Sequence, residues 1–270
     1  RSRGLGDVYK RQATYRAKNV ILAAGGLAAP RLGGGDVGYQ LLSGLGLRLQ
    51  PVYPALSPVY MEDSLLKLAK GVRLDASVTL KNADGTSIRE KGQVQFNENS
   101  LSGIVIMNLS CYLNEGTATG QAASLFLDVL PEITWNDLKH YFVKQRQRFP
   151  KETVLQLLNG VLPEPFSTYI IKRLVLNRDE EIKKLSEKQI NRLTSVLKKL
   201  TFTPVCRQDY DKAQVTGGGL DLREIQIDTF ESVKYPGFYI TGELLDVNGK
   251  CGGYNLTLSL IHISEPTRPY

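Results

Sequence analysis

The sequence predicts an α/β fold in which a parallel sheet is interrupted by a small antiparallel β domain that carries a helical insert. Three observations lead to this prediction. Residues 17–24 form a short apolar run that ends at Gly25-Gly26, which is typical of a buried parallel strand and its turn. A hairpin pattern follows in residues 76–89. Amphipathic helical patterns occupy residues 134–200, after which strands and glycines return.

The first unit continues with a helix and a strand. Asp36 is a candidate N-cap for a helix that runs through Tyr39, Leu42 and Leu45. Gly44 and Gly46 would end this helix. Residues 47–52 then predict a strand.

The β domain is expected over residues 54–130. Residues 76–80 alternate between apolar and polar side chains, and the turn Asn82-Ala83-Asp84-Gly85 separates them from a second strand at 87–89. Further strands are expected at 94–96 and 104–109.

The helical insert has two capping signals. Thr134 with Asp137, and Ser186 with Gln189, have the spacing of capping boxes. After Ser186 an apolar stripe is expected to face the core: Ile190, Leu193, Leu197 and Leu200. Basic residues are expected on the opposite, solvated face, with an RNA surface as the alternative: Lys188, Arg192 and Lys199.

The two ends are interpreted as translated sequencing adapter. One set of eleven codons can encode residues 258–268 while its reverse complement encodes residues 2–12. We therefore expect native sequence only from about Ala13 to Thr257, as a fragment of a longer protein. The expected organisation is adapter (1–12), cofactor-binding part (13–53), β domain (54–130), helical insert (131–200), return through the β domain (201–221), cofactor-binding part (222–257) and adapter (258–270).

Composition narrows the function classes. A hydrophobic content of 42% with 23% charged residues is ordinary for a globular protein and excludes collagen, coiled coil and disorder. Five basic and two acidic residues in the end segments account for three of the seven net positive charges, and the remaining +4 weakens the argument for a nucleic-acid partner. Three scattered cysteines argue against a disulfide framework and a zinc site, and favour a reducing cytoplasm. No apolar run is long enough to span a membrane, so no membrane partner is expected.

Side chains alone give little sign of catalysis, and no catalytic residue is assigned. His140 lies within a predicted helix without an evident nucleophile or acid beside it. Cys251 follows Lys250 and could be a reactive thiol, although a small residue that fills a tight loop is the simpler interpretation. Glycines are more informative, because Gly25-Gly26 and Gly242-Glu243 each follow a predicted strand, at 17–24 and 238–241. We expect these two strands in one parallel sheet, with Gly25 and Gly242 at the same edge, where α/β sheets bind ligands.

A longer pattern resembles one flavoprotein family, the NAD(P)/FAD-dependent oxidoreductases of the aminoacetone-oxidase-like and bile-acid-reductase-like group. The segments that carry the resemblance extend over residues 21–26, 96–103 and 215–255, and include VTGGG at 215–219, PGFY at 236–239, GELLDVNG at 242–249 and GGYN at 252–255. The resemblance covers essentially all of residues 13–257. Residues 97–100 depart from the family pattern in a loop that is expected near the flavin, as does Ile104, so the substrate is left open.

The resemblance implies a Rossmann-like FAD-binding domain, interrupted by the β domain and its helical insert. It implies FAD as cofactor and NAD(P)H as electron donor. The implied cofactor-binding residues are Gly25, Gly26, Gly242, Glu243, Asp246, Gly252, Gly253 and Asn255. Of these, Glu243 would accept hydrogen bonds near the ribityl or pyrophosphate region, with Asp246 close by, and the last three would present backbone and amide groups to the flavin ring.

The expected activity is hydride transfer to an unsaturated or carbonyl-containing small molecule. The alternative is a flavin-dependent RNA-modifying or RNA-binding protein, which an aromatic and basic strand surface would favour; none is evident in the sequence. Nucleic acid is therefore not an expected partner. The 270-residue chain itself is expected to be inactive, since the family's GxGxxG pyrophosphate loop would precede Ala13.

Overall fold

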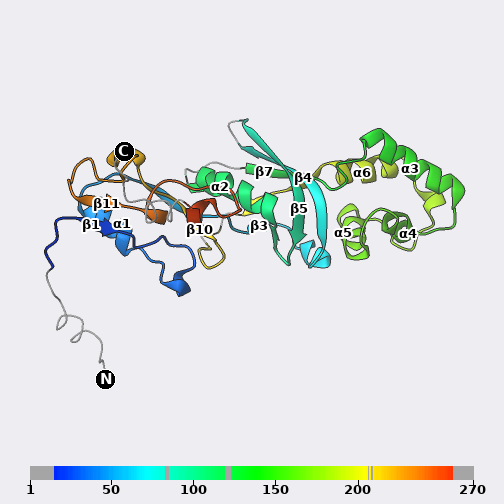
Figure 1. Cartoon of the computed structure of the whole chain (residues 1–270). Coiled ribbons are helices and arrows are strands. Elements are labelled where there is room, and N and C mark those ends of the chain that lie inside the picture. The colour runs from blue at the N-terminus through cyan, green and yellow to red at the C-terminus, as the bar shows by residue number, and fades with distance from the viewer. Residues whose placement is uncertain (1–14, 83–84, 119–122, 206, 208, 258–270) are drawn as a thin grey trace, which may run out of the picture.

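The computed structural model describes residues 15–82, 85–118, 123–205, 207 and 209–257. Both segments that are interpreted as adapter, residues 1–12 and 258–270, lie outside the described residues. The molecule is elongated (Figure 1). A unit with β1 and β11 lies at one end, an antiparallel sheet lies in the middle, and a group of helices lies at the other end.

The first unit contains a parallel strand pair. Strand β1 (Val20–Leu22) pairs in parallel with β11 (Phe238–Ile240), although the two lie more than 200 residues apart. This confirms the predicted pairing, which is the only parallel pair of named strands among the described residues. Helix α1 (Val37–Gly44) follows β1 and buries Tyr39 and Leu42.

Two expectations for this unit were wrong. Strand β1 is not buried, because β11 is its only partner among the described residues and Val20 and Ile21 are 51% and 68% exposed. Asp36 occupies the N-cap position without capping α1. Its backbone is helical, which keeps the side chain from the first-turn N–H groups, and its carboxylate instead accepts a hydrogen bond from Gln40.

Strands β2 (Leu49–Ala55) and β10 (Val215–Leu220) form an antiparallel pair beside this unit. The expected strand at 47–52 is thus present, displaced toward Ala55. The triple glycine 217–219 lies inside β10, where the register shifts between Gly217 and Gly219. Gly218 and Gly219 have φ angles of +74° and +116°, which suit glycine, so the bulge explains why a strand tolerates this run.

The central sheet has seven strands in the described part of the chain, in the order β8-β7-β4-β5-β6-β3-β9. Strands β4 (Arg73–Asn82) and β5 (Ser87–Phe96) form the predicted hairpin. The others are β3 (Val59–Met61), β6 (Ser100–Ser102), β7 (Ala123–Asp128), β8 (Leu200–Phe202) and β9 (Pro204–Val205). All the pairings are antiparallel. The mixed α/β class is therefore confirmed, with a curled antiparallel sheet at its centre.

The strand expected at 104–109 is instead the start of helix α2 (Ile104–Ala118). The β-branched residues in this run suggested a strand. In the fold, Val105, Ile106, Leu109 and Leu113 are buried, which is a helical spacing that packs against the sheet. Tertiary packing thus overrides local propensity.

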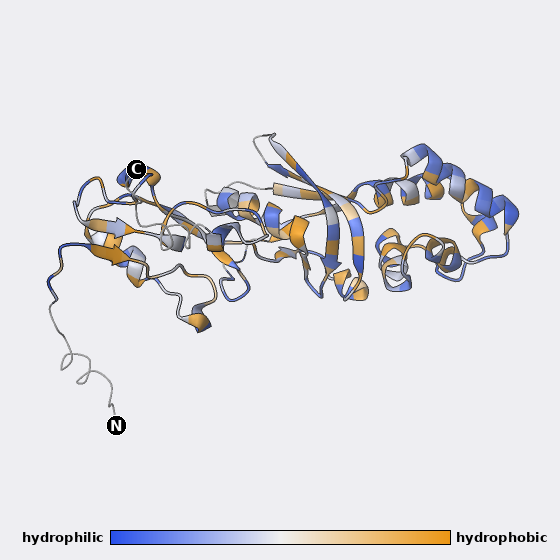
Figure 2. Ribbon diagram, in the orientation of Figure 1, coloured by the Kyte–Doolittle hydropathy of each residue, from blue (hydrophilic) through white to orange (hydrophobic). Residues whose placement is uncertain are grey.

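The helical insert contains α3 (Trp135–Arg148), α4 (Val154–Asn159), α5 (Glu164–Leu174) and α6 (Glu187–Lys198). Thr134 caps α3, and Ser186 with Gln189 forms a complete capping box on α6, as predicted. Leu200 is buried as expected but belongs to β8 rather than to the helix. Figure 2 shows polar residues along the outer side of α3.

Short 3₁₀ turns complete the described elements: Pro30–Leu32, Leu66–Ala69, Ile182–Lys184, Leu222–Glu224 and Gly242–Leu244. The largest apolar cluster spans the central sheet, α2 and the helical insert. A second cluster holds α1 against β10 and β11. A third, smaller cluster around Tyr53, Cys111 and Val215 lies between β2, β10 and α2.

Candidate functional site

Two glycine turns meet at one edge of the parallel pair. Because β1 and β11 run in the same direction, Gly25 and Gly242 follow them at the same edge. The backbone N–H of Thr241 donates to the carbonyl of Leu22 at 3.1 Å, which continues the pairing beyond β11. Gly25 and Gly242 have φ angles of +73° and +75°, where glycine avoids the strain of a side chain.

Thr216 of β10 joins these turns. Its Oγ1 accepts hydrogen bonds from the backbone N–H groups of Leu27 and Ala28 at 2.7 and 2.9 Å. Its own backbone N–H donates to Oε2 of Glu243 at 3.1 Å. A Cβ atom on Gly26 would lie 2.3 Å from Thr216 Oγ1 and 2.6 Å from Glu243 Oε2. The close approach therefore requires glycine at position 26.

Burial shapes the electrostatics of this edge. It raises the pKa of Glu243, and hydrogen bonding from Thr216 opposes part of the rise. Burial also raises the pKa of Asp246, with a contribution from the nearby Asp221 carboxylate. The Tyr39 hydroxyl donates to the Glu243 carbonyl at 2.8 Å, and burial raises the pKa of this phenol. The phenol therefore stays protonated at neutral pH.

The edge has features that fit the hydroxyl and phosphate groups of a nucleotide cofactor. Thr241 Oγ1 is buried and has no hydrogen-bond partner among the described residues. A Cβ atom on Gly25 would meet nothing within 4 Å, so there is open space beside that turn. Hydrogen bonds within the described residues engage only one carboxylate oxygen of Glu243. An unpartnered hydroxyl, a half-buried carboxylate and exposed turn backbone are the groups that bind ribityl and phosphate oxygens.

The predicted residues 252–255 lie where a loop folds back on itself and a helical turn begins at Tyr254. Asn255 accepts a hydrogen bond from the Gly249 N–H at 2.8 Å and donates one to the Gly249 carbonyl at 3.1 Å. Gly252 and Gly253 are exposed, with φ angles of +134° and +94°. The Asn255 amide thus closes the loop, and the contact of these three residues with a cofactor stays a prediction.

Cys251 lies where this loop meets α2. Its backbone N–H donates to Asn108 Oδ1 at 2.9 Å, and its side chain packs on the Tyr53 and Cys111 cluster. A cavity of about 160 Å³ lies beside it, lined by Asn108, Cys111, Tyr112, Glu115, Asn248, Gly249 and Lys250. Packing of this kind agrees with the space-filling interpretation of Cys251.

Tyr53 is positioned from both sides of this junction. Its hydroxyl accepts a hydrogen bond from Asn248 at 3.1 Å, and burial raises the pKa of the phenol. A Cβ atom on Gly217 would lie 2.3 Å from the Tyr53 ring, so Gly217 makes room for it. The hydroxyl can still donate its proton toward the loop that contains Asn248.

Other side-chain chemistry is sparse in the described residues. His140 is exposed on α3. Within the described ranges, no group of three or more His, Cys, Asp or Glu side chains is placed to hold a metal ion. None of the described helices combines the length and the apolar character needed to cross a membrane.

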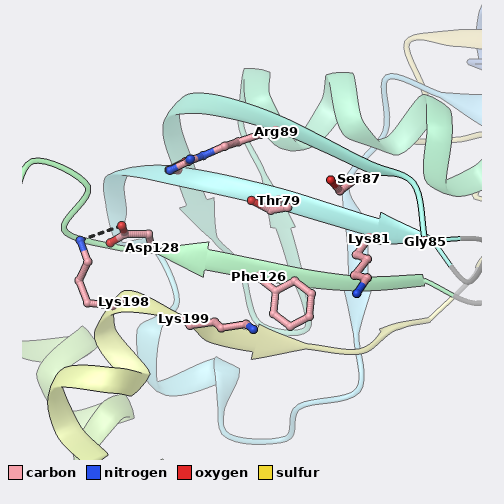
Figure 3. A pocket seen from close by; sticks show the side chains of 10 residues that line it. Thr79, Lys81, Gly85, Ser87, Arg89, Phe126, Asp128, Lys198 and Lys199 are labelled. Atoms are coloured by element: carbon pink, nitrogen blue, oxygen red, sulfur yellow. Dashed lines mark hydrogen bonds and ion pairs between the residues drawn. The ribbon is translucent and has the colours of Figure 1, made fainter. Parts of the chain in front are cut away.

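A second feature, a polar hollow of about 490 Å³, lies on the central sheet (Figure 3). Basic side chains line it around one aromatic ring: Lys81, Arg89, Lys198 and Lys199, with Phe126. The Lys199 ammonium lies 4.7 Å from the centre of the Phe126 ring. No aromatic and basic strand surface was evident in the sequence, and the structure corrects this. Strand pairing and the end of α6 bring distant residues together.

Three residues of the glycine-turn edge were missed as site residues: Tyr39, Thr216 and Thr241. Thr216 stands within the VTGGG segment and Thr241 directly before Gly242. Their proximity to the glycine motifs was the available signal. Their contacts depend on pairing between residues about 190 to 200 positions apart, which no local pattern encodes.

Comparison with known proteins gives two kinds of match. The model of the HI0933-like protein barrel and H2TH domain matches residues 53–215. A 3-dehydro-bile acid delta(4,6)-reductase of Clostridium scindens is 32% identical over 242 residues, which is 90% of this chain and 59% of the relative. Ribosomal RNA dihydrouridine synthases of Escherichia coli and Haemophilus influenzae are each 30% identical, over 90% and 89% of this chain and 58% and 57% of their own lengths. The chain thus spans somewhat less than three fifths of the length of these curated relatives.

Proposed function

Since this chain belongs to the HI0933-like protein family, we propose that it is part of an FAD-dependent oxidoreductase that reduces a carbon–carbon double bond. The observation that carries the proposal is the meeting of Gly25-Gly26, Thr216 and Gly242-Glu243 at one edge of the parallel pair. Ligands of α/β sheets bind at such edges. The Rossmann-like character of this unit is part of the same proposal.

In this proposal the residues of the edge bind and orient the cofactor. Gly25 and Gly26 let backbone approach it closely, and the free Glu243 oxygen and Thr241 Oγ1 take its hydroxyl groups. Asp246 lies in the segment that follows. Gly252, Gly253 and Asn255 hold the loop that would lie against the flavin ring. FAD, when bound, supplies the hydride transfer, and NAD(P)H is the proposed donor.

The names of the relatives indicate a shared type of reaction. A delta(4,6)-reductase acts on double bonds, and dihydrouridine is uridine with two added hydrogens. We extend this type of reaction to the present chain, with a small unsaturated or carbonyl-containing molecule as acceptor. A protonated phenol such as that of Tyr53 is suited to hold a proton at the junction beside the loop.

The test is Glu243→Ala in the protein expressed from its complete gene. Loss of a charge-assisted acceptor costs about 1.5–3 kcal/mol, which is about 10- to 150-fold in FAD affinity. Glu243→Gln should lose less, because its carbonyl still accepts. FAD retention after gel filtration, followed by anaerobic bleaching with NADH and NADPH, measures both effects.

Two variants serve as matched controls. Cys251→Ala and His140→Ala should retain FAD and be reduced normally, since neither side chain has a role in cofactor binding here. Unchanged FAD affinity in Glu243→Ala would refute the proposed role of this carboxylate. A Cys251→Ala protein that keeps FAD but cannot turn over would identify a redox or proton-donating thiol.

A second candidate function is reduction of a base in RNA. The observation that favours it is the hollow with Phe126 and its basic neighbours on the central sheet. Two of the relatives are named as acting on ribosomal RNA. Reduction assays with a steroid enone and with RNA as alternative acceptors distinguish the two candidates.

A further inference from the structure

The hollow on the central sheet continues along the helical insert as one surface. We define the basic–aromatic surface by six residues: Lys81, Arg89, Phe126, Trp135, Arg192 and Lys199. The first two come from neighbouring strands, where Thr79 pairs with both Arg89 and Phe126. Figure 3 shows Lys199 beside the Phe126 ring.

Contacts connect the sheet part of this surface to the helices. Arg192, Ser195 and Lys199 are exposed and follow one another at helical spacing along α6 and its end. The Trp135 indole N–H of α3 donates to Ser195 Oγ at 3.1 Å. The surface therefore runs from Trp135, across α6, to Phe126 and the β4–β5 hairpin.

The surface carries unbalanced positive charge. Asp128 pairs with Lys198 at 2.8 Å, so that lysine is neutralised. Within the described residues, no ion pair neutralises Lys81, Arg89, Arg192 or Lys199. Hydroxyls of Thr79 and Ser87 line the same hollow. Cations beside hydroxyl groups are suited to phosphate oxygens spaced along a chain.

Each aromatic ring of the surface has a cation close to it. Lys199 lies 4.7 Å from the centre of the Phe126 ring, and Lys139 lies 5.5 Å from that of Trp135. Both rings are partly exposed. Proteins that bind single strands combine such rings, on which bases stack, with a basic path for the backbone. A protein partner would instead call for a buried apolar centre, and among the described residues that line the hollow Phe126 has the only large apolar side chain.

We propose that the basic–aromatic surface binds single-stranded RNA. The phosphates lie along Lys81, Arg89, Arg192 and Lys199, and bases stack on Phe126 and Trp135. The choice of RNA rests on the second candidate under the proposed function, and the surface gives that candidate a binding site. Binding itself requires neither FAD nor turnover.

The test measures binding of fluorescein-labelled oligouridine, about 16 nucleotides long, to the 270-residue chain by fluorescence anisotropy. The wild-type chain should bind with a dissociation constant on the order of 1 µM at about 0.1 M salt. The triple variant Lys81→Gln/Arg89→Gln/Lys199→Gln should bind at least about tenfold more weakly. Its slope of log affinity against log salt should fall by about 2, at about 0.7 per lost phosphate contact.

Two further variants separate site binding from general attraction. Lys18→Gln/Lys67→Gln/Arg178→Gln removes the same charge from exposed positions outside the surface and should change affinity less than about threefold. Phe126→Leu keeps every charge and should weaken binding about fivefold or more through lost stacking. Circular dichroism identifies any variant that fails to fold, and Phe126→Leu still tests the surface if the triple variant does.

Three results would overturn the proposal: no binding by the wild-type chain, an equal loss in both triple variants, or full affinity in Phe126→Leu. A complete protein that binds RNA through this surface but retains no FAD would refute the proposed reductase function alone. FAD retention without RNA binding would refute the surface alone.

Discussion

The backbone N–H of Thr216 lies 3.1 Å from Oε2 of Glu243, and this hydrogen bond ties β10 to the turn after β11. Thr216 also accepts two N–H groups from the turn after β1 through its hydroxyl. One residue therefore fixes both turns at the edge where a ligand would bind. A change at this point should alter the edge without unfolding the central sheet.

Gly26→Ala should destabilise the chain, because its Cβ atom would lie 2.3 Å from Thr216 Oγ1. The same Cβ atom would lie 2.6 Å from Oε2 of Glu243. Overpacking of this kind costs about 1–3 kcal/mol. Thermal unfolding followed by circular dichroism measures the loss. Gly35→Ala is the matched control, since its Cβ would meet nothing within 4 Å and its φ angle is not left-handed. Equal melting temperatures for the two variants would contradict the packing of this edge.

Glu243→Gln should stabilise the cofactor-free chain over the pH range that runs from the ordinary pKa of a glutamate up through the raised pKa of Glu243 and beyond it. Burial raises the pKa of Glu243 above its ordinary value, so the folded state holds this proton more tightly than the unfolded state. The wild-type chain therefore loses stability as pH rises through that range, and the neutral amide avoids the loss. Melting temperatures of both proteins between about pH 4 and 8 should converge at the acid end. A constant difference across this range would show that the carboxylate is not the titrating group.

Local patterns predicted the elements that local chemistry determines. The β4–β5 hairpin follows from alternation and the Asn-Ala-Asp-Gly turn, and the Ser186 capping box from two side chains three residues apart. Helix α2 could not be predicted in this way, because its β-branched start favours a strand until the sheet covers Val105 and Ile106.

The glycine-turn edge and the basic–aromatic surface differ in how much of each could be predicted from the sequence. The glycine turns of the edge were visible as motifs, and the prediction that they share one sheet edge is confirmed. The basic–aromatic surface was not visible, because Phe126 and Lys199 are 73 positions apart and meet only through the order of the strands and the end of α6.

Gly217→Ala should destabilise the junction between β2, β10 and α2. Its Cβ would lie 2.3 Å from Cε2 of Tyr53, whose ring is buried and held by Asn248. We expect a loss of about 1–3 kcal/mol in the free energy of unfolding. Tyr53→Leu provides space, so the double variant should lose less than the sum of the two single losses. Denaturant unfolding of the four proteins gives this coupling, and strictly additive losses would contradict the contact.

Asp63→Ala should weaken the attachment of the helical insert to the central sheet. The Asp63 carboxylate follows β3 and is 9% exposed; it accepts hydrogen bonds from Tyr169 at 2.7 Å and from Arg173, both on α5. Removal of the carboxylate leaves the buried Tyr169 phenol without its acceptor and takes the ion-pair partner from Arg173, whose guanidinium still donates to the Thr201 carbonyl. We expect a loss of about 1–3 kcal/mol in the free energy of unfolding, because buried groups without partners retain their full desolvation cost.

Glu132→Ala is the control, since its pair with Lys91 is exposed and should contribute less than about 1 kcal/mol. Denaturant unfolding measures both variants. Similar losses in the two would show that the Asp63 contacts are no stronger than a surface ion pair.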